Sequence, residues 1–456
     1  MFKAFTNGCV KLVQKYLPDA FVFCIILTIV VFIVAMPVTG MNPIEMASAW
    51  GNGVWNLLAF SMQMALVLVL GSALANAPAI KRLIIKLAHV PKKPVTAIGF
   101  VFVISGICCF INWGFGLIIG ALLAKEVAKN LPKVDYRLII AAAYSGFVVW
   151  HSGISGSIPL GLTALGEDGT VANTGGTVTE IVPTSETIFS PWNLIMVLIV
   201  IVVLAIVLMK MHPDPKNTVS IDPKLLADEV EEQPIPKTPA ERVENSMVLS
   251  YIVVILGVVF LIYYFVSSGS ILNALSLNIV NLIFLILGIA FHRTPIGYVR
   301  AIGEAAKSSG GIILQFPFYA GIQGMMVTAG ADGVSLAGAI SSFFVSISNA
   351  HTFPVFCYLA AGIVNFFVPS GGGQWAVQGP IMMPAGAKLG VSHAVTAMGI
   401  AWGDAWTNML QPFWALPALG IAKLGARDIM GYCAIVLIVS GILTALGFLF
   451  IVPLFV

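Results

Sequence analysis

The chain has 456 residues, of which 59% are hydrophobic and only 9% are charged, and its mean hydropathy is +0.98. A soluble globular domain carries roughly 25% charged residues, so this composition excludes a soluble protein that covers itself with polar surface. The small net charge of +3 and the lack of a soluble basic face also argue against a nucleic-acid partner. The composition therefore predicts an all-α integral membrane protein that spans the bilayer many times.

The six cysteines lie mostly in apolar runs and form no CxxC pair, which argues against a disulfide framework or a zinc site. We interpret them as small apolar packing residues. The sequence also lacks the HExxH pattern of zinc metalloproteases. We therefore expect neither a metal nor another cofactor.

The first half of the chain contains four stretches of about 20 mostly apolar residues, the length that a lipid-spanning helix needs. They cover residues 20–38, 54–75, 138–162 and 191–211. Residues 95–129 are also apolar, but the turn-forming sequence Asn112-Trp113-Gly114-Phe115-Gly116 interrupts them near the middle. Each arm has about 15–18 residues, which is marginal for a full span, so we predict a re-entrant hairpin.

A hydrophilic linker rich in Pro, Asp, Glu and Lys follows at residues 212–246, and an extra span is predicted at 247–270. The second half, residues 271–456, again contains four spans and one interrupted stretch. The spans cover residues 271–291, 308–327, 394–424 and 430–452, and the hairpin at 352–388 is interrupted by Pro369-Ser370-Gly371-Gly372-Gly373. The total is nine spans and two hairpins.

Charge indicates the orientation, because cytoplasmic loops carry an excess of Lys and Arg. Lys3, Lys11 and Lys15 predict a cytoplasmic N-terminus, and both flanks of the first hairpin are basic, as a hairpin that returns to the same side requires. The loop 163–190 is acidic and has no Lys or Arg, so we expect it to be external. Of the 23 Lys and Arg residues only Lys388 falls outside in this topology, and the C-terminus is then external.

The two halves also resemble each other in sequence. Pro43-Ile44, Gly51 and Gln63 recur 252 residues later as Pro295-Ile296, Gly303 and Gln315, while Gly114 and Pro159 recur 258 residues later as Gly372 and Pro417. Five spans, an odd number, precede the second half, so the repeats at 1–211 and 271–456 should have opposite orientations. Inverted repeats with broken helices around a midplane site are the architecture of many secondary transporters.

The spans at 138–162 and 394–424 are broken by Gly, Pro and polar residues, and unwound backbone in mid-membrane is tolerated only where it lines a cavity or is buried in protein. The resulting half-helices present free N–H groups that suit a carboxylate. No Lys or Arg occurs in their centres, which favours a weak site for a small monoanion. The predicted substrate-binding residues are Asn112, Trp113, Gly114, Gly116, Ser152, Ser155, Ser157, Ser370, Gly371, Gly372, Gly373, Gln374, Thr407 and Asn408.

Six tryptophans cluster around the same elements and are candidates to wall a compact pocket for a short alkyl chain, namely Trp113, Trp150, Trp375, Trp402, Trp406 and Trp414. The alternative for each is an interface anchor or simple packing, and for the Ser, Thr and Asn residues it is a helix–helix hydrogen bond.

Asp404 and His151 are the titratable residues of the two broken spans. A carboxylate in mid-membrane is costly and indicates function, so both residues are candidates for cation coupling, with Asp404 a candidate proton carrier. The structural alternatives are a carboxylate that caps a helix break and a hydrogen-bonded interior histidine.

At these residues the chain resembles the bacterial short-chain fatty acid transporters, uptake permeases for acetoacetate and butyrate in a larger ion-transporter superfamily. The stretches that carry the resemblance are 113–118, 150–157, 369–375 and 403–414. The resemblance implies cation-coupled symport of a short monocarboxylate across the bacterial inner (plasma) membrane by an elevator-like, alternating-access mechanism. Related scaffolds surrounded by membrane lipid are often homodimers, so a homodimer is implied by analogy.

The same motifs bear on the choice of coupling ion and on the alternative functions. Sodium-coupled relatives use Ser-Asn-Thr triplets at the hairpin tips, where this sequence has Asn112, Ser370 and the Thr407-Asn408 pair, so we prefer proton coupling to a sodium-coupled symporter. An inorganic-ion antiporter or channel on the same scaffold is an alternative. A remote one is an intramembrane serine protease, because Gly153-Ile154-Ser155-Gly156 matches a GxSG pattern, with His151 as its candidate base.

Overall fold

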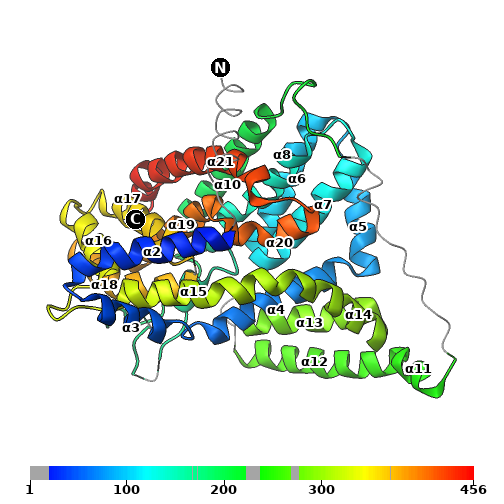
Figure 1. Ribbon diagram of the computed structural model, residues 1–456, viewed down its shortest axis with the longest axis horizontal. Helices are drawn as coiled ribbons and strands as arrows, with labels where there is room; N and C mark the ends of the chain where they lie inside the picture. Colours follow the sequence, from blue (N-terminus) through cyan, green and yellow to red (C-terminus); the bar gives the residue numbers. More distant parts are fainter. Residues whose placement is uncertain (1–19, 167, 172, 222–236, 269–276, 370) are drawn as a thin grey trace.

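The computed structural model describes residues 20–166, 168–171, 173–221, 237–268, 277–369 and 371–456 (Figure 1). These residues are mainly helical and contain no β-strand, only an isolated bridge between Leu165 and Val171. The described part of the chain therefore has the predicted all-α class. Lys3, Lys11 and Lys15, on which the cytoplasmic N-terminus was predicted, lie outside the described residues.

The described part of the first half contains helices at each predicted span and two short helices besides. Four precede the first hairpin: α2 (Ala20–Thr39), α3 (Pro43–Gly53), α4 (Leu58–Ala75) and α5 (Pro78–Ala88). The hairpin and the first broken helix follow as α6 (Pro94–Ile111), α7 (Trp113–Asn130), α8 (Tyr136–Ser145), the 3₁₀ segment η1 (Gly146–Ser152) and α9 (Ser157–Gly161). The half ends with α10 (Pro191–Lys210).

After α11 (Pro239–Glu244) and α12 (Met247–Ser267), the second half repeats this order. Its first helices are α13 (Leu277–His292), α14 (Pro295–Ala306), α15 (Gly310–Val327) and α16 (Leu336–Ser346). The second hairpin, broken helix and last long helix are α17 (Phe353–Phe367), α18 (Gly371–Lys388), α19 (His393–Thr407), the 3₁₀ turn η4 (Asn408–Leu410), α20 (Pro412–Ala422) and α21 (Ala426–Leu446).

The helix starts have local causes in the sequence. Pro191 and Pro412 occupy the first turns of α10 and α20, where the missing N–H costs nothing and the fixed φ angle favours a helix. Asn112 ends α6 and caps α7, because its Oδ1 accepts the N–H of Phe115 at 2.9 Å. This one residue therefore makes the break of the first hairpin.

Both predicted hairpins are pairs of antiparallel helices. In the first, Gly116 of α7 lies against Cys109 of α6, and Gly120 lies against Ser105, so the contacts run in opposite directions from the break. In the second, Gln374 Nε2 of α18 donates to Ala361 O of α17 at 2.8 Å. Glycine at 116 and 120 lets the two backbones approach closely, as in other membrane helix pairs.

Several short helices were not predicted. α3, α5, α14 and α16 have 11 or 12 residues each, too few to cross a bilayer, and they lie between the predicted spans; the short α11 is a fifth, inside the predicted hydrophilic linker. α5 follows α4 after a bend of 74°. Such short helices lack the long apolar run by which a span is recognised.

By length and composition, five described segments could cross a membrane, or six if the bent α4–α5 pair is one span. The predicted total of nine spans is not confirmed by this count. α6 is one of the five, with 18 residues and a mean hydropathy of 2.3. α6 is the first arm of the first predicted hairpin. The re-entrant character of both hairpins stays a prediction.

The broken helices form the centre of the molecule. In an 18-residue apolar window of the segment Tyr136–Gly161, which contains the first break, 89% of the residues are buried, against 6% in the corresponding window of Pro239–Ser267, which contains α12. α19 packs against η1, α17 and α18. The polar residues of both breaks therefore lie in the protein interior, whereas the apolar side chains of α12 face outward, as lipid-contacting side chains do.

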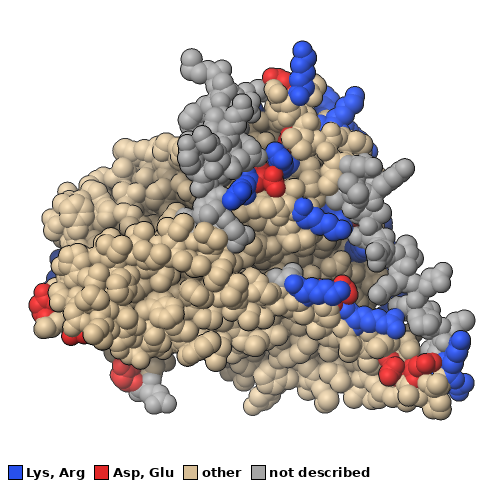
Figure 2. Space-filling model, viewed as in Figure 1, with Lys and Arg blue, Asp and Glu red and all other residues tan. Residues whose placement is uncertain are grey.

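Charged side chains are unevenly distributed over the surface. Lys and Arg gather toward the right and the top of the view in Figure 2, around α5, α8 and α11 in Figure 1. The opposite end, near α3 and α16, displays mainly Asp and Glu on this face. The surface between the two ends is almost free of charge in this view, as expected for a segment surrounded by lipid.

Candidate functional site

A buried pair of titratable residues joins the two broken helices. His151 of η1 and Asp404 of α19 are both 0% exposed, and His151 Nδ1 lies 2.7 Å from Asp404 Oδ2. The sequence indicated each residue separately, and the structure brings them together across 253 positions of the chain. Such burial of a charge is tolerated where the charge is paired and hydrogen-bonded.

The other ring nitrogen of His151 faces the start of α9. The Ile158 backbone N–H donates to Nε2 at 3.1 Å, and Ser157 Oγ lies 3.0 Å from the same atom. Because a backbone N–H can only donate, Nε2 must offer its lone pair. The ring proton is then on Nδ1, where it is donated to Asp404, so the geometry fits a neutral imidazole beside a carboxylate.

Asn365 of α17 connects the second hairpin to the second break. Its Nδ2 lies 2.8 Å from each of three acceptors, which are Asp404 O, Thr407 Oγ1 and Asn408 Oδ1. Thr407 and Asn408 were predicted site residues, and they do lie together. Sequence reasoning missed Asn365, although a lone amide in an apolar helix was the available signal.

The tip of the second hairpin lies directly against His151. A Cβ atom on Gly371 would lie 2.5 Å from His151 Cε1 and 2.5 Å from Ser157 Oγ, so only glycine permits this approach. A Cβ on the neighbouring Gly372 would meet no described residue within 4 Å. The two glycines therefore differ sharply in their surroundings.

The other residues predicted at this tip brace the hairpin. Gln374 Nε2 donates to Gln378 Oε1 at 2.7 Å, inside the hairpin. The Gly373 carbonyl accepts from Gln323 Nε2 of α15 at 3.3 Å. Ser370, also predicted as a binding residue, lies outside the described residues.

The tip of the first hairpin is held by the first broken helix. The Trp113 backbone N–H donates to Ser155 Oγ at 3.0 Å, and Gly114 packs tightly against Val67 of α4. Ser155, the serine of the GxSG pattern, thus supports this tip. The hydroxyl beside His151 belongs to Ser157 instead. The pairing of Ser155 with His151, considered from the GxSG pattern, is therefore wrong.

Asn193 at the start of α10 is a second residue that the sequence reasoning missed. Its Nδ2 donates to the Ser152 carbonyl at 3.0 Å, and its Oδ1 accepts from Trp402 Nε1 at 2.9 Å. One buried amide therefore links η1, α10 and α19. Ser152, predicted as a binding residue, donates its hydroxyl to Val149 O at 2.8 Å and supports the 3₁₀ segment.

Three of the six predicted tryptophans meet in an aromatic cluster, formed by Trp113, Phe147, Trp150 and Trp414. Phe147 and Trp150 are stacked with a centroid distance of 5.4 Å, and Trp113 meets Trp414 edge-on at 5.3 Å. Trp150 also stacks on the His151 ring at 4.1 Å. The cluster therefore lies directly beside the buried pair and offers an apolar wall.

The other three tryptophans do not join this cluster. Trp402 donates to Asn193, and Trp406 Nε1 donates to Leu437 O at 2.7 Å. The Trp375 ring lies near Gly161 of α9. The predicted wall of six tryptophans therefore reduces to three.

Several buried polar atoms at the breaks make no hydrogen bond to any residue that the structure describes. The donors are Asn112 Nδ2, Trp150 Nε1, Trp375 Nε1 and Asn408 Nδ2. Asp404 Oδ1 is an acceptor of this kind, although the Asn408 side chain lies beside the carboxylate. Each unsatisfied buried group costs roughly 1–3 kcal/mol, so such a concentration indicates a place for a ligand or bound water.

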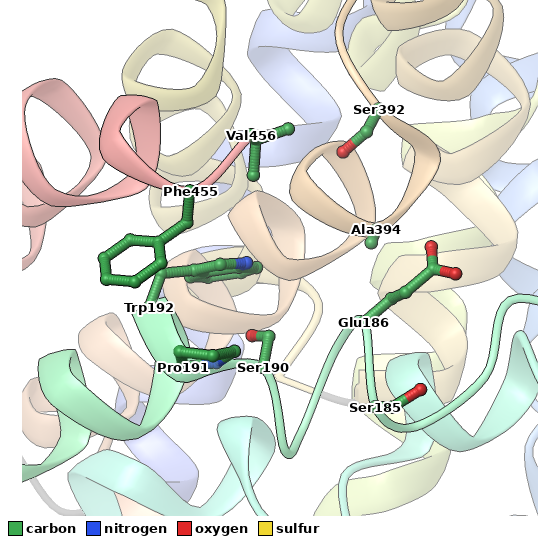
Figure 3. Close-up of a pocket in the computed structure, with 9 residues that line it drawn as sticks. All are labelled: Ser185, Glu186, Ser190, Pro191, Trp192, Ser392, Ala394, Phe455 and Val456. Atoms are coloured by element: carbon green, nitrogen blue, oxygen red, sulfur yellow. The ribbon is translucent and has the colours of Figure 1, made fainter.

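A pocket of about 300 Å³ lies away from this centre, between the starts of α10 and α19 (Figure 3). Trp192 and Phe455 supply its aromatic lining, and Glu186 lines it from the loop before α10. None of the predicted binding residues that the structure describes lines it. The pocket brings together three segments that the sequence places on the external side.

Comparison with known proteins identifies the family. The sequence model described as "Short chain fatty acid transporter" matches residues 1–451. Two relatives named "Putative short-chain fatty acid transporter" each cover 96% of this chain and 97% of their own length: the protein of Escherichia coli (strain K12) is 45% identical, and that of Haemophilus influenzae (strain ATCC 51907 / DSM 11121 / KW20 / Rd) is 44% identical.

Among solved structures, the YdaH transporter of Alcanivorax borkumensis is similar at 15% identity, over 94% of this chain and 98% of that one, with a TM-score of 0.47. The family model and the two relatives span nearly the whole chain, and the described helices include several with the length and composition of membrane spans. The chain is a multi-pass membrane protein and belongs to the short-chain fatty acid transporter family.

Proposed function

We propose that the protein is a secondary transporter that carries acetoacetate, butyrate and similar short monocarboxylates across the membrane together with protons. The observation that carries this proposal is the set of unpartnered, buried N–H donors at the helix breaks, next to the His151–Asp404 pair. Donors without a partner favour an anionic ligand. The family supplies the class of acid.

The helix ends at the breaks favour a monocarboxylate. α7, α18 and α20 each begin at a break, and a helix N-terminus carries a partial positive charge that stabilises an anion. The centres of the broken helices contain no Lys or Arg, so the carboxylate would be held by dipoles and would be released easily. Asp404 would repel a second negative charge, which disfavours dicarboxylates.

The aromatic cluster favours a short, apolar chain on the acid. Trp113, Trp150 and Trp414 are 3–6% exposed, so the space beside them is bounded by rigid rings. A carboxylate near the start of α18 would lie beside Trp150, because a Cβ on Gly371 would be 3.0 Å from that ring. The alkyl chain would then extend toward Phe147 and Trp414.

The buried carboxylate explains why a proton would accompany the anion. Two unit charges at a separation of roughly 8 Å repel each other by about 2 kcal/mol when the effective dielectric constant is about 20. A proton on the His151–Asp404 pair removes this repulsion. Proton and substrate therefore favour each other's binding, and linkage makes the effect reciprocal.

An inverted-repeat architecture is supported by contacts between the two halves. Phe21 of α2 meets Phe318 of α15 at 5.1 Å, and Gln63 of α4 donates to Asn278 of α13 at 2.8 Å. By the order of elements, α2 corresponds to α13 and α4 to α15, so these two contacts are equivalent. A pseudo-two-fold axis between the halves would produce them as a pair.

The directions of these helices support the inversion. His292, at the end of α13, hydrogen-bonds Ala73 O near the end of α4 at 2.8 Å, so α13 runs parallel to α4. If α2 and α4 are consecutive spans, α13 runs opposite to its counterpart α2. We propose alternating access by elevator-like movement of the hairpins and broken helices against the remaining helices.

Contacts at the two ends support the predicted sidedness. Arg137 pairs with Asp428 at 3.1 Å, and Asp135 accepts the Val219 N–H at 2.8 Å; the sequence assigns all of these to the cytoplasmic side. The pocket of Figure 3 unites segments assigned to the external side. We propose an inner-membrane protein with a cytoplasmic N-terminus and an external C-terminus.

Sodium is the alternative coupling ion. Asp404 O, Thr407 Oγ1 and Asn408 Oδ1 converge on Asn365 at the C-terminal end of α19, and oxygen atoms at a helix C-terminus suit a cation. In the described structure the Asn365 amide occupies the point of convergence, which disfavours a cation there.

The order of hydrogen bonds Asp404–His151–Ser157 is that of a serine hydrolase. The Ile158 N–H shares Nε2 with the Ser157 hydroxyl, which weakens the ring as a base for that serine. The family assignment also favours transport. A reactive serine would be detected by a fluorophosphonate probe, and we expect no labelling that depends on Ser157.

The substrate class is tested by competition against exchange of labelled acetoacetate in proteoliposomes. Unlabelled monocarboxylates from C2 to C6 should compete, whereas the matched amides and dicarboxylates should not. Because protonated short-chain acids cross lipid unaided, protein-free vesicles give the background. Competition by butyramide equal to that by butyrate would refute the proposed carboxylate site.

A further inference from the structure

His151 and Asp404 have separate tasks in proton binding. We propose that the transported proton binds Asp404 at Oδ1, while His151 stays neutral and acts as a positioning residue. This inference rests on the proposed proton coupling, and it resolves a choice that the sequence left open between the two residues. It is carried by the surroundings of three atoms: His151 Nε2 and Asp404 Oδ2, which accept hydrogen bonds, and Asp404 Oδ1, which accepts none from the described residues.

The surroundings of His151 Nε2 oppose a second proton on the ring. The Ile158 N–H points at this atom from 3.1 Å and is fixed in the first turn of α9. The Ser157 hydroxyl can rotate, but a backbone N–H cannot become an acceptor. Protonation of Nε2 would set two donors against each other, so the imidazolium form is disfavoured by geometry.

The Asp404 carboxylate has one occupied and one unoccupied oxygen. Oδ2 accepts from His151 Nδ1 at 2.7 Å. Oδ1 is buried and accepts no hydrogen bond of good geometry from the described residues, although the Asn408 side chain lies beside the carboxylate. A proton taken up from the aqueous phase onto a lone pair of Oδ1 gives a neutral carboxylic acid and leaves the hydrogen bond from His151 to Oδ2 in place. Release on the other side reverses this step, and no bond at His151 changes.

No neighbouring side chain is a better acceptor for the transported proton. The elements that carry the pair, η1 and α19, pack against each other and against α6, α7, α8, α9, α10, α17, α18, α21 and η4. Within the bounds of these elements the interior titratable groups are phenols and thiols, which are neutral near pH 7: Cys108, Cys109, Tyr136, Tyr144, Cys357, Tyr358, Tyr432 and Cys433. The buried carboxyl of Asp135 caps the start of α8, where it accepts the N–H groups of Leu138 and Val219. The charged or imidazole groups lie toward the ends of these helices or at the start of α19: Lys125, Glu126, Lys129, Arg137, Lys210, Lys388, His393, Arg427 and Asp428.

Infrared difference spectroscopy of the full-length protein in lipid identifies the protonated group directly. Lowering the pH should produce a carboxylic acid C=O band that is present in wild type and in His151→Asn and absent in Asp404→Asn. A band that survives in Asp404→Asn would overturn the assignment. An imidazolium band that appears in wild type and disappears in His151→Asn would overturn it as well.

A matched pair of His151 variants separates positioning from proton carrying. The side-chain amide of Asn can supply an N–H at the position of Nδ1, whereas Gln reaches only the position of Nε2. In His151→Asn, a proton gradient should therefore still stimulate uptake. In His151→Gln, the stimulation of uptake should be about tenfold smaller, a change equivalent to one pKa unit. Equal loss in both variants, with Asp404→Asn still stimulated, would make His151 the carrier and refute the proposal.

The spectroscopic result is independent of coupling. If a proton gradient fails to stimulate wild-type uptake while the carboxylic acid band still depends on Asp404, the proposed coupling is wrong and the assignment of the proton site stands. If uptake is stimulated but the band does not depend on Asp404, the coupling stands and the assignment fails.

Discussion

Substitution of Gly371 by alanine tests whether the second hairpin must close directly onto His151. Both Gly371 and Gly372 lie in the first turn of α18, and alanine raises helix propensity at each. Only at Gly371 would the new Cβ lie 2.5 Å from two atoms, His151 Cε1 and Ser157 Oγ. Gly372→Ala is therefore a matched control for every effect except this overlap.

The size of the effect follows from the overlap. Overpacking of a well-packed interior costs about 1–3 kcal/mol, and each 1.36 kcal/mol corresponds to tenfold in an equilibrium or a rate. If the closed hairpin is required for transport, Gly371→Ala should lower the initial rate of uptake by roughly 5-fold to 150-fold relative to Gly372→Ala.

The assay is acetoacetate uptake into proteoliposomes that contain equal amounts of each variant. Thermal unfolding in detergent serves as the control for folding, and both variants should unfold near the wild-type temperature. Gly371→Ala with the same uptake as Gly372→Ala would contradict the close approach of the hairpin tip to His151. The proposed position of the carboxylate beside Trp150 would then lose its geometric basis.

Three further substitutions test other parts of the structure. Asn365→Ala removes the amide whose two N–H groups are shared among three acceptors and should destabilise the protein by roughly 2–4 kcal/mol; an unchanged melting temperature would contradict this. Trp414→Ala should shift the competition profile toward longer acids, because the aromatic cluster loses one wall, and an unaltered profile would refute that role. Arg137→Ala should cost only about 0–1 kcal/mol, because its pair with Asp428 is 33% and 24% exposed, and a double-mutant cycle with Asp428→Ala measures it.

The fold was predictable from sequence wherever long apolar runs or Gly- and Pro-rich interruptions occur. The break of the first hairpin falls at Asn112, inside the predicted interruption. The first broken helix does change to 3₁₀ at Gly146 and restart at Ser157. Short helices such as α3 and α16 were not predicted, because 11 residues cannot form the long apolar run that identifies a span.

The candidate site was predictable as a list of residues and not as a set of contacts. The pairing of His151 with Asp404 depends on how two halves of the chain fold together, and no local pattern contains that information. The choice between Ser155 and Ser157 depends on the extended backbone at Gly153, with φ −105° and ψ −173°, which turns the two serines toward different partners. Residue spacing on a regular helix could not reveal this.

Asn193 and Asn365 were missed for a related reason. Each is a single amide in a long apolar segment, and its importance lies in the partners that it joins, Ser152 and Trp402 for Asn193 and the end of α19 for Asn365. A buried polar side chain in a membrane helix indicates a partner. The sequence does not indicate which partner.

The initial rate of acetoacetate uptake under separately imposed gradients tests the central claim most directly. Wild-type proteoliposomes should take up acetoacetate faster with an inward proton gradient than without one, after subtraction of protein-free vesicles. An inward sodium gradient at constant pH should have no effect, and Asp404→Asn should lose the response to protons. Stimulation by sodium alone, with no response to the proton gradient, would contradict proton-coupled transport by this protein.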